Sequence, residues 1–386
     1  MIRFGKEGSY FWLGMIVVAL FVLIVSYCPA SAIVTGLFGQ NLFDVLAKRY
    51  GPSDRKITNT QFDGVPVRIY EPPKTADSQQ PAVFYMHGGG FRCLSVDTLH
   101  PFTDDLATKL DIVVISIDYR LSTEALFPAA IDDCTKAVVW FLNHTKDYNV
   151  DSTKVIIMGE SAGGNLAAGV TQRITLDPMY QHVPKLRAHI LICPMLQAMD
   201  FNTPAYQQYG EYETALLQKE VVVASWVEYL TGSAQLQEVF ATNMHTSPAA
   251  KKSDLFQKVL SHDNIPERFK IPPYVAPSST DFGDEDLYET LKTQLLDPSF
   301  APLMRDGSLK GIPEAYIVTC TYDVLRDDGI FYVKRLEAAG VKVTWVHNDD
   351  GIHAMSIYSA TGPFAVKAGV RSRQKLFAFI ENTLKT

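Results

Sequence analysis

A serine framed by glycines is the residue of this sequence whose surroundings most suggest chemistry. In "IIMGESAGGNLAA", Gly159 and Gly163 stand two positions to either side of Ser161. The motif follows an apolar run typical of a buried strand and opens a run of small residues that favours a helix. A serine on so sharp a turn takes up strained backbone geometry, so its neighbours two positions away must lack bulk. The pattern predicts a nucleophilic Ser161.

A serine hydroxyl is a weak nucleophile near neutral pH, so it needs a histidine base that an acid orients. When the serine lies on a turn of this kind, the acid and then the histidine follow it along the chain. The histidines after Ser161 are His182, His189, His245, His262, His347 and His353. His353, in "NDDGIHAMS", falls in a polar turn after the last expected strand, where a catalytic histidine should emerge.

The acid of the expected triad is Asp323. It stands just after the apolar run "AYIVTC", at the expected end of a strand. Asp327 and Asp328 fall at the start of the next helix, where acidic residues are ordinarily partners of the helix dipole. Position along the chain therefore favours Asp323, and the predicted triad is Ser161, Asp323 and His353.

Three glycines follow a histidine in "YMHGGGFRC", at the end of another apolar run. Acyl transfer passes through a tetrahedral intermediate whose oxyanion needs fixed N–H donors. We expect the amides of Gly88, Gly89 and Ala162 to supply the oxyanion hole. His87 completes this segment, and its side chain is expected to brace the loop and not to act as a second base.

From about Val65 the chain alternates short β-branched runs with longer amphipathic segments. Such an order is typical of a mostly parallel sheet flanked by helices on both faces, an α/β fold. The expected strands are residues 67–72, 82–87, 112–120, 154–159, 187–194, 314–320 and 341–348. The expected helices are residues 101–110, 128–144, 325–340 and a segment starting at residue 161.

One region breaks this alternation. Residues 197–311 are rich in aromatic residues, proline and charge, and they offer helices without an obvious buried strand. We interpret them as a lid inserted over the carboxyl edge of the sheet, where open α/β sheets bind ligands. The alternative is a helical layer that belongs to the main core. On this interpretation residues 65–386 form one catalytic domain.

The N-terminus is an expected membrane anchor. Residues 1–9 read as a cytosolic tail, 10–28 as an uncharged helix long enough to cross a bilayer, and 29–64 as a linker with an N-terminal cap segment. Arg3 and Lys6 precede the apolar run and would hold that end in the cytosol. The alternative is a signal peptide cleaved near Ala30–Ala32, after which the protein would be secreted. Either way the catalytic part leaves the cytosol.

Composition narrows the possible partners. The net charge is -7 and the pI is about 5.7, so nucleic acid is not an expected partner. Asn143, in "NHT", is a possible glycosylation site. The chain has five cysteines, of which Cys28 ends the apolar N-terminal run. One or two disulfides are therefore possible in an oxidising compartment, although Cys134 and Cys193 read as buried core thiols.

With "HGGG", "GESAGG", "DVLRD" and "DGIHA" in this order, the chain resembles the hormone-sensitive lipase group of α/β-hydrolases. Its N-terminal run and "YRLSTEALFPAA", "WVEYL", "IPERF" and "TCTYDVLRDDG" look most similar to arylacetamide deacetylases and neutral cholesterol ester hydrolases. The resemblance covers essentially Val65 to the C-terminus. It implies a single-pass type II serine esterase of the endoplasmic reticulum membrane with a luminal catalytic domain and no metal or organic cofactor.

The resemblance also implies a disulfide between Cys93 and Cys320, which would tie the oxyanion loop to the strand of the acid. This sequence departs from the family pattern there, because Cys93 sits one place later than expected and Leu94 stands where glycine is common.

The expected function is therefore a membrane-anchored carboxylesterase acting on lipophilic esters or arylacetamides. The alternative within the enzymes is a sterol-ester or acylglycerol lipase. A non-catalytic ligand-binding protein is the alternative outside them, because fold does not fix function. The intact set of triad and glycine residues favours an enzyme. The acyl preference and the oligomeric state are not encoded in these motifs.

Overall fold

The computed structural model describes residues 55–72, 78–211, 217–358 and 365–385. The predicted tail, anchor and most of the linker, together with Cys28, lie outside these residues. Within them, no helix combines the length and the apolar character needed to cross a membrane.

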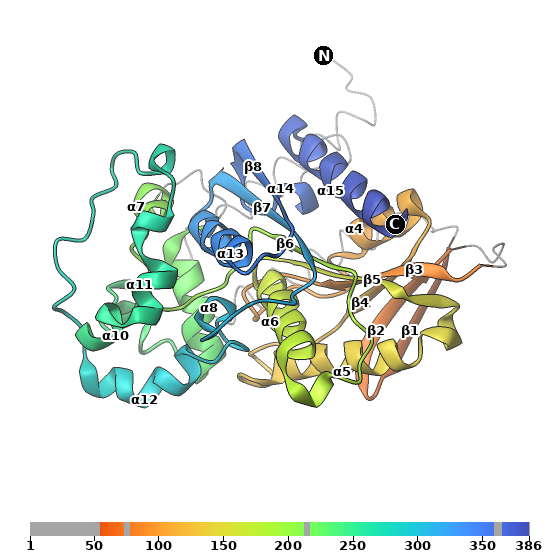
Figure 1. The fold of residues 1–386 in the computed structure, drawn as a ribbon, viewed down its shortest axis with the longest axis horizontal. Coiled ribbons are helices and arrows are strands. Elements are labelled where there is room, and N and C mark those ends of the chain that lie inside the picture. Colours follow the sequence, from red (N-terminus) through yellow and green to blue (C-terminus); the bar gives the residue numbers. More distant parts are fainter. Residues whose placement is uncertain (1–54, 73–77, 212–216, 359–364, 386) are drawn as a thin grey trace, which may run out of the picture.

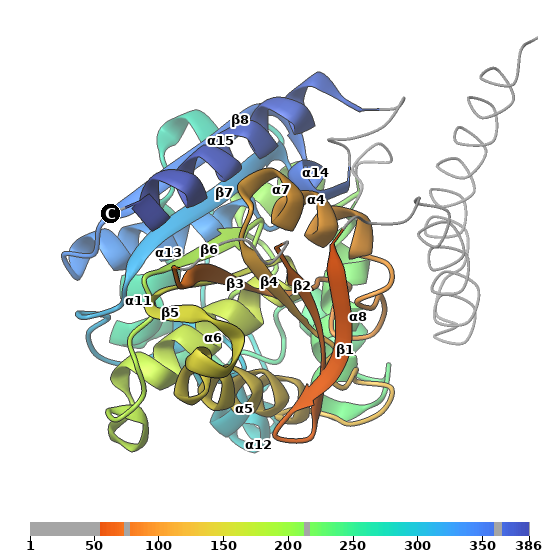
Figure 2. The ribbon, with the colours of Figure 1, turned by 90° about the vertical axis from the view of Figure 1, so that its right-hand side faces the viewer.

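A single mixed sheet forms the centre of the described structure (Figures 1 and 2). Its eight strands lie in the order β1-β2-β4-β3-β5-β6-β7-β8. Strand β2 is antiparallel to both of its neighbours, and the strands from β4 to β8 in this order run parallel. The bounds are β1 Lys56–Phe62, β2 Val65–Glu71, β3 Gln80–Met86, β4 Val113–Ile117, β5 Val150–Glu160, β6 Ala188–Ile192, β7 Glu314–Tyr322 and β8 Val343–Ile352. The predicted parallel sheet is confirmed.

The boundary that we drew at residue 65 is wrong. Lys56–Phe62, which the sequence interpretation left in the linker, forms strand β1 and pairs along its whole length with β2. Its burial is low except at Phe62, because it is the edge strand. The segment thus lacks the apolar pattern that marks the central strands.

Helices cover both faces of the sheet, as expected for parallel strands buried on each side. Along β3, Phe84 and Met86 join the core under helices α5, α6 and α13, whereas Val83 and Tyr85 join the core under α4 and α15. These helices span α4 His100–Leu110, α5 Ala129–Asn143, α6 Ala162–Leu176, α13 Arg326–Ala338 and α15 Lys367–Lys385, and α14 is Met355–Tyr358. The C-terminal helix α15 was not among the elements that the sequence interpretation named.

Only helices and irregular segments connect β6 and β7 in the described part of residues 197–311. They gather at one end of the molecule, away from β1 (Figure 1). The α-helices are α7 Pro204–Tyr209, α8 Lys219–Thr231, α9 Gln237–Ala241, α10 Pro248–Lys252, α11 Asp254–Leu260 and α12 Glu285–Leu295. Helix α8 packs on the loop after β3, because the rings of Phe91 and Tyr229 stack 4.0 Å apart.

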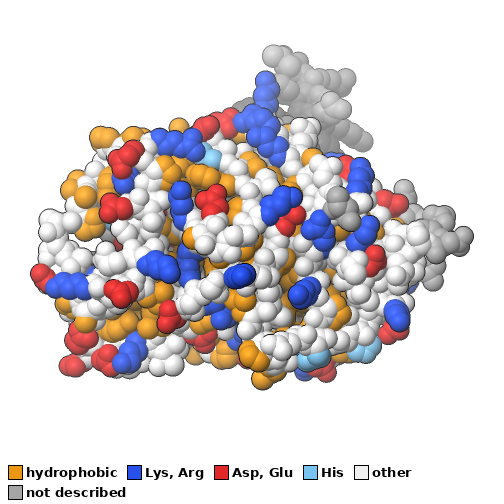
Figure 3. Space-filling view, viewed as in Figure 1, with side chains coloured by type: hydrophobic (Ala, Val, Ile, Leu, Met, Phe, Trp, Pro, Cys, Tyr) orange, Lys and Arg blue, Asp and Glu red, His pale blue; other side chains and the backbone are white. Residues whose placement is uncertain are grey.

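Acidic and basic side chains are interspersed on the face seen in Figure 3, with apolar side chains between them. This face therefore carries no stripe of a single charge sign of the kind that nucleic-acid binding requires.

Candidate active site

Ser161 occupies a strained turn between β5 and α6. Its φ of 57° and ψ of -122° lie outside the helical region, and helix α6 begins at the next residue. The Ser161 amide donates to the carbonyl of Ile192 at 2.9 Å. A Cβ atom on Gly163 would lie 2.0 Å from the Met86 carbonyl oxygen. A glycine is therefore required there, because the neighbouring strand leaves no room for a side chain.

His353 and Asp323 come together at the carboxyl ends of β8 and β7. The Asp323 carboxylate lies 2.9 Å from His353 Nδ1, and both residues are buried. Burial acts to lower the pKa of His353, but the charge and the hydrogen bond of Asp323 outweigh it, so the pKa is raised. An imidazole held in this way has a fixed tautomer, with its Nε2 left to exchange a proton.

Cys193 connects this pair to the serine turn. It follows Ile192, the partner of the Ser161 amide, and its thiol accepts a hydrogen bond from the Ala354 amide at 3.5 Å. Cys193, Asp323 and His353 are donor types that could hold a metal ion, with ligand atoms within 4.8 Å of one another. They fit a metal poorly, because Nδ1 of His353 is already engaged by Asp323. In addition, contact with the Cys320 thiol and burial raise the pKa of Cys193.

The oxyanion loop corrects one prediction. The Gly88 amide does not point toward a substrate oxygen, since it donates to the carboxylate of Glu160 at 2.7 Å. Gly88 nevertheless lies against the nucleophile, because a Cβ atom placed on it would be 3.2 Å from Ser161 Cβ. The amides of Gly89 and Gly90 donate to no acceptor among the described residues. The amide of Ala162 is also available, because the first amides of a helix have no partner within it.

The side chain of His87 supports the oxyanion loop. Its Nδ1 lies 2.8 Å from the Gly88 carbonyl, and its ring stacks on Tyr119 at 4.4 Å. The Tyr119 hydroxyl donates to the His87 carbonyl at 2.7 Å. Burial lowers the pKa of His87 to about 4, so the ring is neutral near pH 7. A neutral, stacked imidazole suits a structural role.

The disulfide predicted between Cys93 and Cys320 does not form. Both cysteines are free in the structure. The Cys93 thiol donates back to the carbonyl of Gly89 at 3.2 Å, within its own loop. The sulfur of Cys320 instead lies 3.7 Å from that of Cys193, too far for the S–S bond of about 2.05 Å. The altered spacing of the cysteine after the glycines agrees with this different loop path.

Asn143 is the last residue of α5 and is exposed, and its side-chain amide donates to the Val139 carbonyl at 3.0 Å. Thr145 of the same sequon is buried. Glycosylation of Asn143 stays a prediction.

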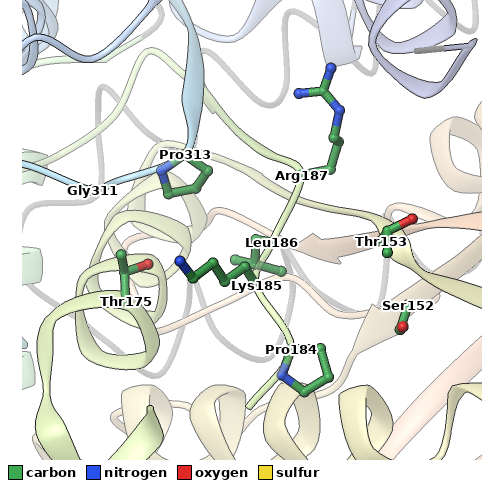
Figure 4. Close-up of a pocket in the computed structure, with 9 residues that line it drawn as sticks. All are labelled: Ser152, Thr153, Thr175, Pro184, Lys185, Leu186, Arg187, Gly311 and Pro313. Atoms are coloured by element: carbon green, nitrogen blue, oxygen red, sulfur yellow. The ribbon is translucent and has the colours of Figure 1, made fainter. Parts of the chain in front are cut away.

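A surface cavity of about 530 Å³ lies at the opposite edge of the sheet (Figure 4). Its lining comes from the first residues of β5 and from the segments that lead into β6 and β7, and it includes Thr153, Arg187 and Pro313. Thr153 and Glu160 lie seven positions apart along β5, which is roughly 23 Å at about 3.3 Å per residue. This cavity is therefore not the site of Ser161.

Sequence reasoning missed Glu160, Gly90 and Cys193 as parts of this site. Glu160 had a usable signal in the sequence, because it is a lone carboxylate at the end of the apolar run "VIIMGE". In the structure it is fully buried. The other two had none, since their positions depend on how separate loops meet.

Comparison with known proteins places the chain in a family. Residues 83–260 and 265–357 match the model of the α/β hydrolase fold family. The chain is 38% identical over 340 residues to neutral cholesterol ester hydrolase 1 of Rattus norvegicus, with 85% of this chain and 80% of that protein covered. It is 40% identical over 313 residues to the arylacetamide deacetylase of Mus musculus, with 78% and 75% covered.

Solved structures of esterases share the fold of this chain. The carboxylesterase EstE1, from a metagenomic library, superposes with a TM-score of 0.67 at 25% identity and covers 92% of this chain and 98% of its own. A bacterial heroin esterase gives 0.66 at 21% identity, covers 95% and 97%, and shows the shared fold. The fold and the serine turn define a hydrolase of carboxylic esters. The chain belongs to the α/β-hydrolase family, together with the neutral cholesterol ester hydrolases and arylacetamide deacetylases.

Proposed function

We propose that this ester hydrolase is a serine carboxylesterase that cleaves lipophilic esters or arylacetamides through an acyl-enzyme. The observation that carries the proposal is the His353–Asp323 hydrogen bond of 2.9 Å. Ser161, Asp323 and His353 directly follow the parallel strands β5, β7 and β8, so the nucleophile, the acid and the base stand at the same edge of the sheet.

In the first half-reaction the Ser161 oxygen attacks the substrate carbonyl carbon while His353 Nε2 takes the hydroxyl proton. Asp323 holds the imidazole and stabilises its positive charge. The amides of Gly89, Gly90 and Ala162 donate to the oxyanion that forms. The C–O or C–N bond to the leaving group then breaks, and His353 returns its proton to that group.

In the second half-reaction water replaces the leaving group. His353 takes a proton from the water as its oxygen bonds to the acyl carbon. The bond between that carbon and Ser161 breaks, the serine oxygen regains the proton, and a carboxylic acid is released.

The lipophilic substrate class is supported by the names of the curated relatives, which point toward sterol esters in one case and aryl amides in the other. The rings beside the oxyanion loop have a different role. Phe91 packs on Trp226 and Tyr229 of α8 at ring distances of 5.8 and 4.0 Å, and all three rings are fully buried. They therefore hold the loop on α8.

A sterol-ester or acylglycerol lipase is the second candidate, favoured by the 38% identity to a neutral cholesterol ester hydrolase. The test is hydrolysis of p-nitrophenyl esters from acetate to palmitate by the full chain in detergent, with Ser161→Ala as its partner. Activity that depends on Ser161 and falls with chain length supports the carboxylesterase, whereas a maximum at long chains supports the lipase. Undiminished activity in Ser161→Ala would refute the mechanism.

We further propose that residues 10–28 anchor the enzyme in the endoplasmic reticulum membrane with the catalytic domain in the lumen. The support is the uncharged length of this run and the basic residues Arg3 and Lys6 before it. Protease treatment of sealed microsomes should leave the domain intact, and Asn143→Gln should remove one glycan. Digestion of the domain would contradict the orientation, and release of the domain from carbonate-washed membranes would indicate a cleaved signal instead.

A further inference from the structure

Glu160 is a fully buried carboxylate directly before the nucleophile. It accepts three hydrogen bonds: from the Gly88 amide at 2.7 Å, the Tyr85 hydroxyl at 2.6 Å and the Tyr358 hydroxyl at 3.0 Å. No salt bridge to Glu160 occurs among the described residues. A buried charge that is held by hydrogen bonds alone is costly, so its presence calls for a reason.

The three donors come from separate parts of the fold. Gly88 opens the oxyanion loop after β3, and Tyr358 ends α14, which follows His353 by two residues. Tyr85 belongs to β3 and lies on the sheet beside Glu160. The carboxylate therefore touches the oxyanion loop and the histidine-bearing segment, while its own backbone continues into Ser161.

We propose that Glu160 is a positioning residue for ester hydrolysis, whose carboxylate holds the oxyanion loop and the segment after His353 in register on either side of Ser161. The inference rests on the proposed serine mechanism and concerns how that site is kept assembled. Glu160 is not itself a catalytic residue, because both of its oxygens are occupied by protein donors.

The donors remain donors over the working pH range. Burial and the charge of Glu160 raise the pKa of Tyr85 well above the ordinary tyrosine value. Tyr358 is 44% exposed, and its hydroxyl donates to Glu160 in its ordinary protonated form. Hydrogen bonds to an ionised acceptor are roughly twice as strong as neutral ones. In its ionised form, which prevails above its raised pKa of about 7, Glu160 thus fixes Gly88 more firmly than a neutral acceptor would.

The far end of the oxyanion loop is held independently. Arg92 and Glu228 of α8 form an ion pair at 3.2 Å, and Phe91 stacks on Tyr229. Loss of Glu160 would therefore leave the Gly88 amide without its acceptor, with only the Gly88 carbonyl still held by His87, while the other end of the loop stays in place. Gly89 and Gly90 lie between these two attachment points, so their amides would no longer be held in a fixed direction.

The test compares Glu160→Ala, Tyr358→Phe and the double variant, as full chains in detergent, on a short p-nitrophenyl ester. Removal of one oxyanion donor costs about 100- to 1,000-fold in kcat, so loss of its anchor should cost roughly 10- to 100-fold. We expect Glu160→Ala to lower kcat and kcat/KM by this factor with KM nearly unchanged. We expect Tyr358→Phe to lower kcat by about 3-fold, and the double variant to match Glu160→Ala.

Tyr316→Phe is the matched control, because its buried hydroxyl has no hydrogen-bond partner among the described residues. It should leave kcat and KM unchanged. An alkylboronic acid, which forms a tetrahedral adduct with serine, should lose affinity in proportion to kcat/KM across the Glu160 and Tyr358 variants.

Three results would overturn the inference: wild-type kcat in folded Glu160→Ala, losses that multiply in the double variant, or a loss carried wholly by KM. If Glu160→Ala fails to fold, Tyr358→Phe still decides, since unchanged kcat and boronate affinity in that variant refute the link. Ser161→Ala distinguishes failure of the serine mechanism from failure of the positioning role of Glu160. Undiminished activity in Ser161→Ala would refute the serine mechanism.

Discussion

The free energy of unfolding of Glu160→Gln, compared with that of the wild type, should increase as the pH rises. Burial raises the pKa of Glu160 from the ordinary value of 4.5 to about 7, although its three donors act to lower it. In this range the folded protein binds a proton more tightly than the unfolded chain does. The stability that Glu160 contributes is therefore fully present below about pH 4.5 and is lost as the pH rises through 7.

The size of the effect follows from these values. A pKa difference of one unit is worth about 1.4 kcal/mol, so the full loss between the two pKa values is about 3 kcal/mol. Most of this loss, about 2 to 3 kcal/mol, falls between about pH 5 and about pH 8. Gln at position 160 does not titrate, so the free energy of unfolding of Glu160→Gln, minus that of the wild type, should increase by this amount.

Urea unfolding followed by tryptophan fluorescence measures this difference at each pH, in the same detergent for both proteins. Other buried groups cancel in the comparison, among them Asp328, whose pKa burial also raises to about 7. Gln keeps one carbonyl oxygen for the Gly88 amide, so the variant should fold. A difference that stays flat between about pH 5 and about pH 8 would refute the assignment of a buried, titrating carboxylate.

Three further predictions concern the rest of the site. Asp323→Asn should lower kcat by about 10,000-fold with little change in KM, because His353 would lose its tautomer; a loss below about 10-fold in steady-state assays would contradict the triad. Thiol labelling of the unfolded, unreduced protein followed by peptide mapping should find Cys93 and Cys320 both modified, and a linked peptide pair would restore the disulfide. Gly163→Ala should yield little folded protein, because its Cβ would lie 2.0 Å from a backbone oxygen of β3, and a wild-type unfolding midpoint would show that the turn has room.

Much of the fold was readable from local pattern. The central strands are near-continuous apolar runs because both of their faces are buried, and the structure has them where the sequence put them. Strand β1 escaped because an edge strand alternates exposed and half-buried residues and resembles a loop in composition. Helix α15 was not predicted, because the segment before it carries no motif, although the sequence of the helix itself is amphipathic.

The features of the site also fall into those set by local sequence and those set by tertiary packing. The serine turn depends on glycines within a few residues, so its chemistry is encoded locally. The Asp323–His353 contact joins residues 30 positions apart, and it could be inferred only because parallel strands bring their carboxyl ends to one edge. The direction of the Gly88 amide could not be inferred, because its acceptor lies 72 residues away.

The sequence by itself determined the kind of sheet, the nucleophile and the order of base and acid, because each rests on spacing along the chain or on one buried run. Only the tertiary structure decided which amides of the glycine loop remain free, that Cys320 lies beside Cys193 and not Cys93, and that Glu160 joins three segments. These features depend on hydrogen bonds and contacts between loops that are distant in sequence. Their directions are set by packing, because a buried donor or acceptor takes whichever partner the assembled core brings within reach.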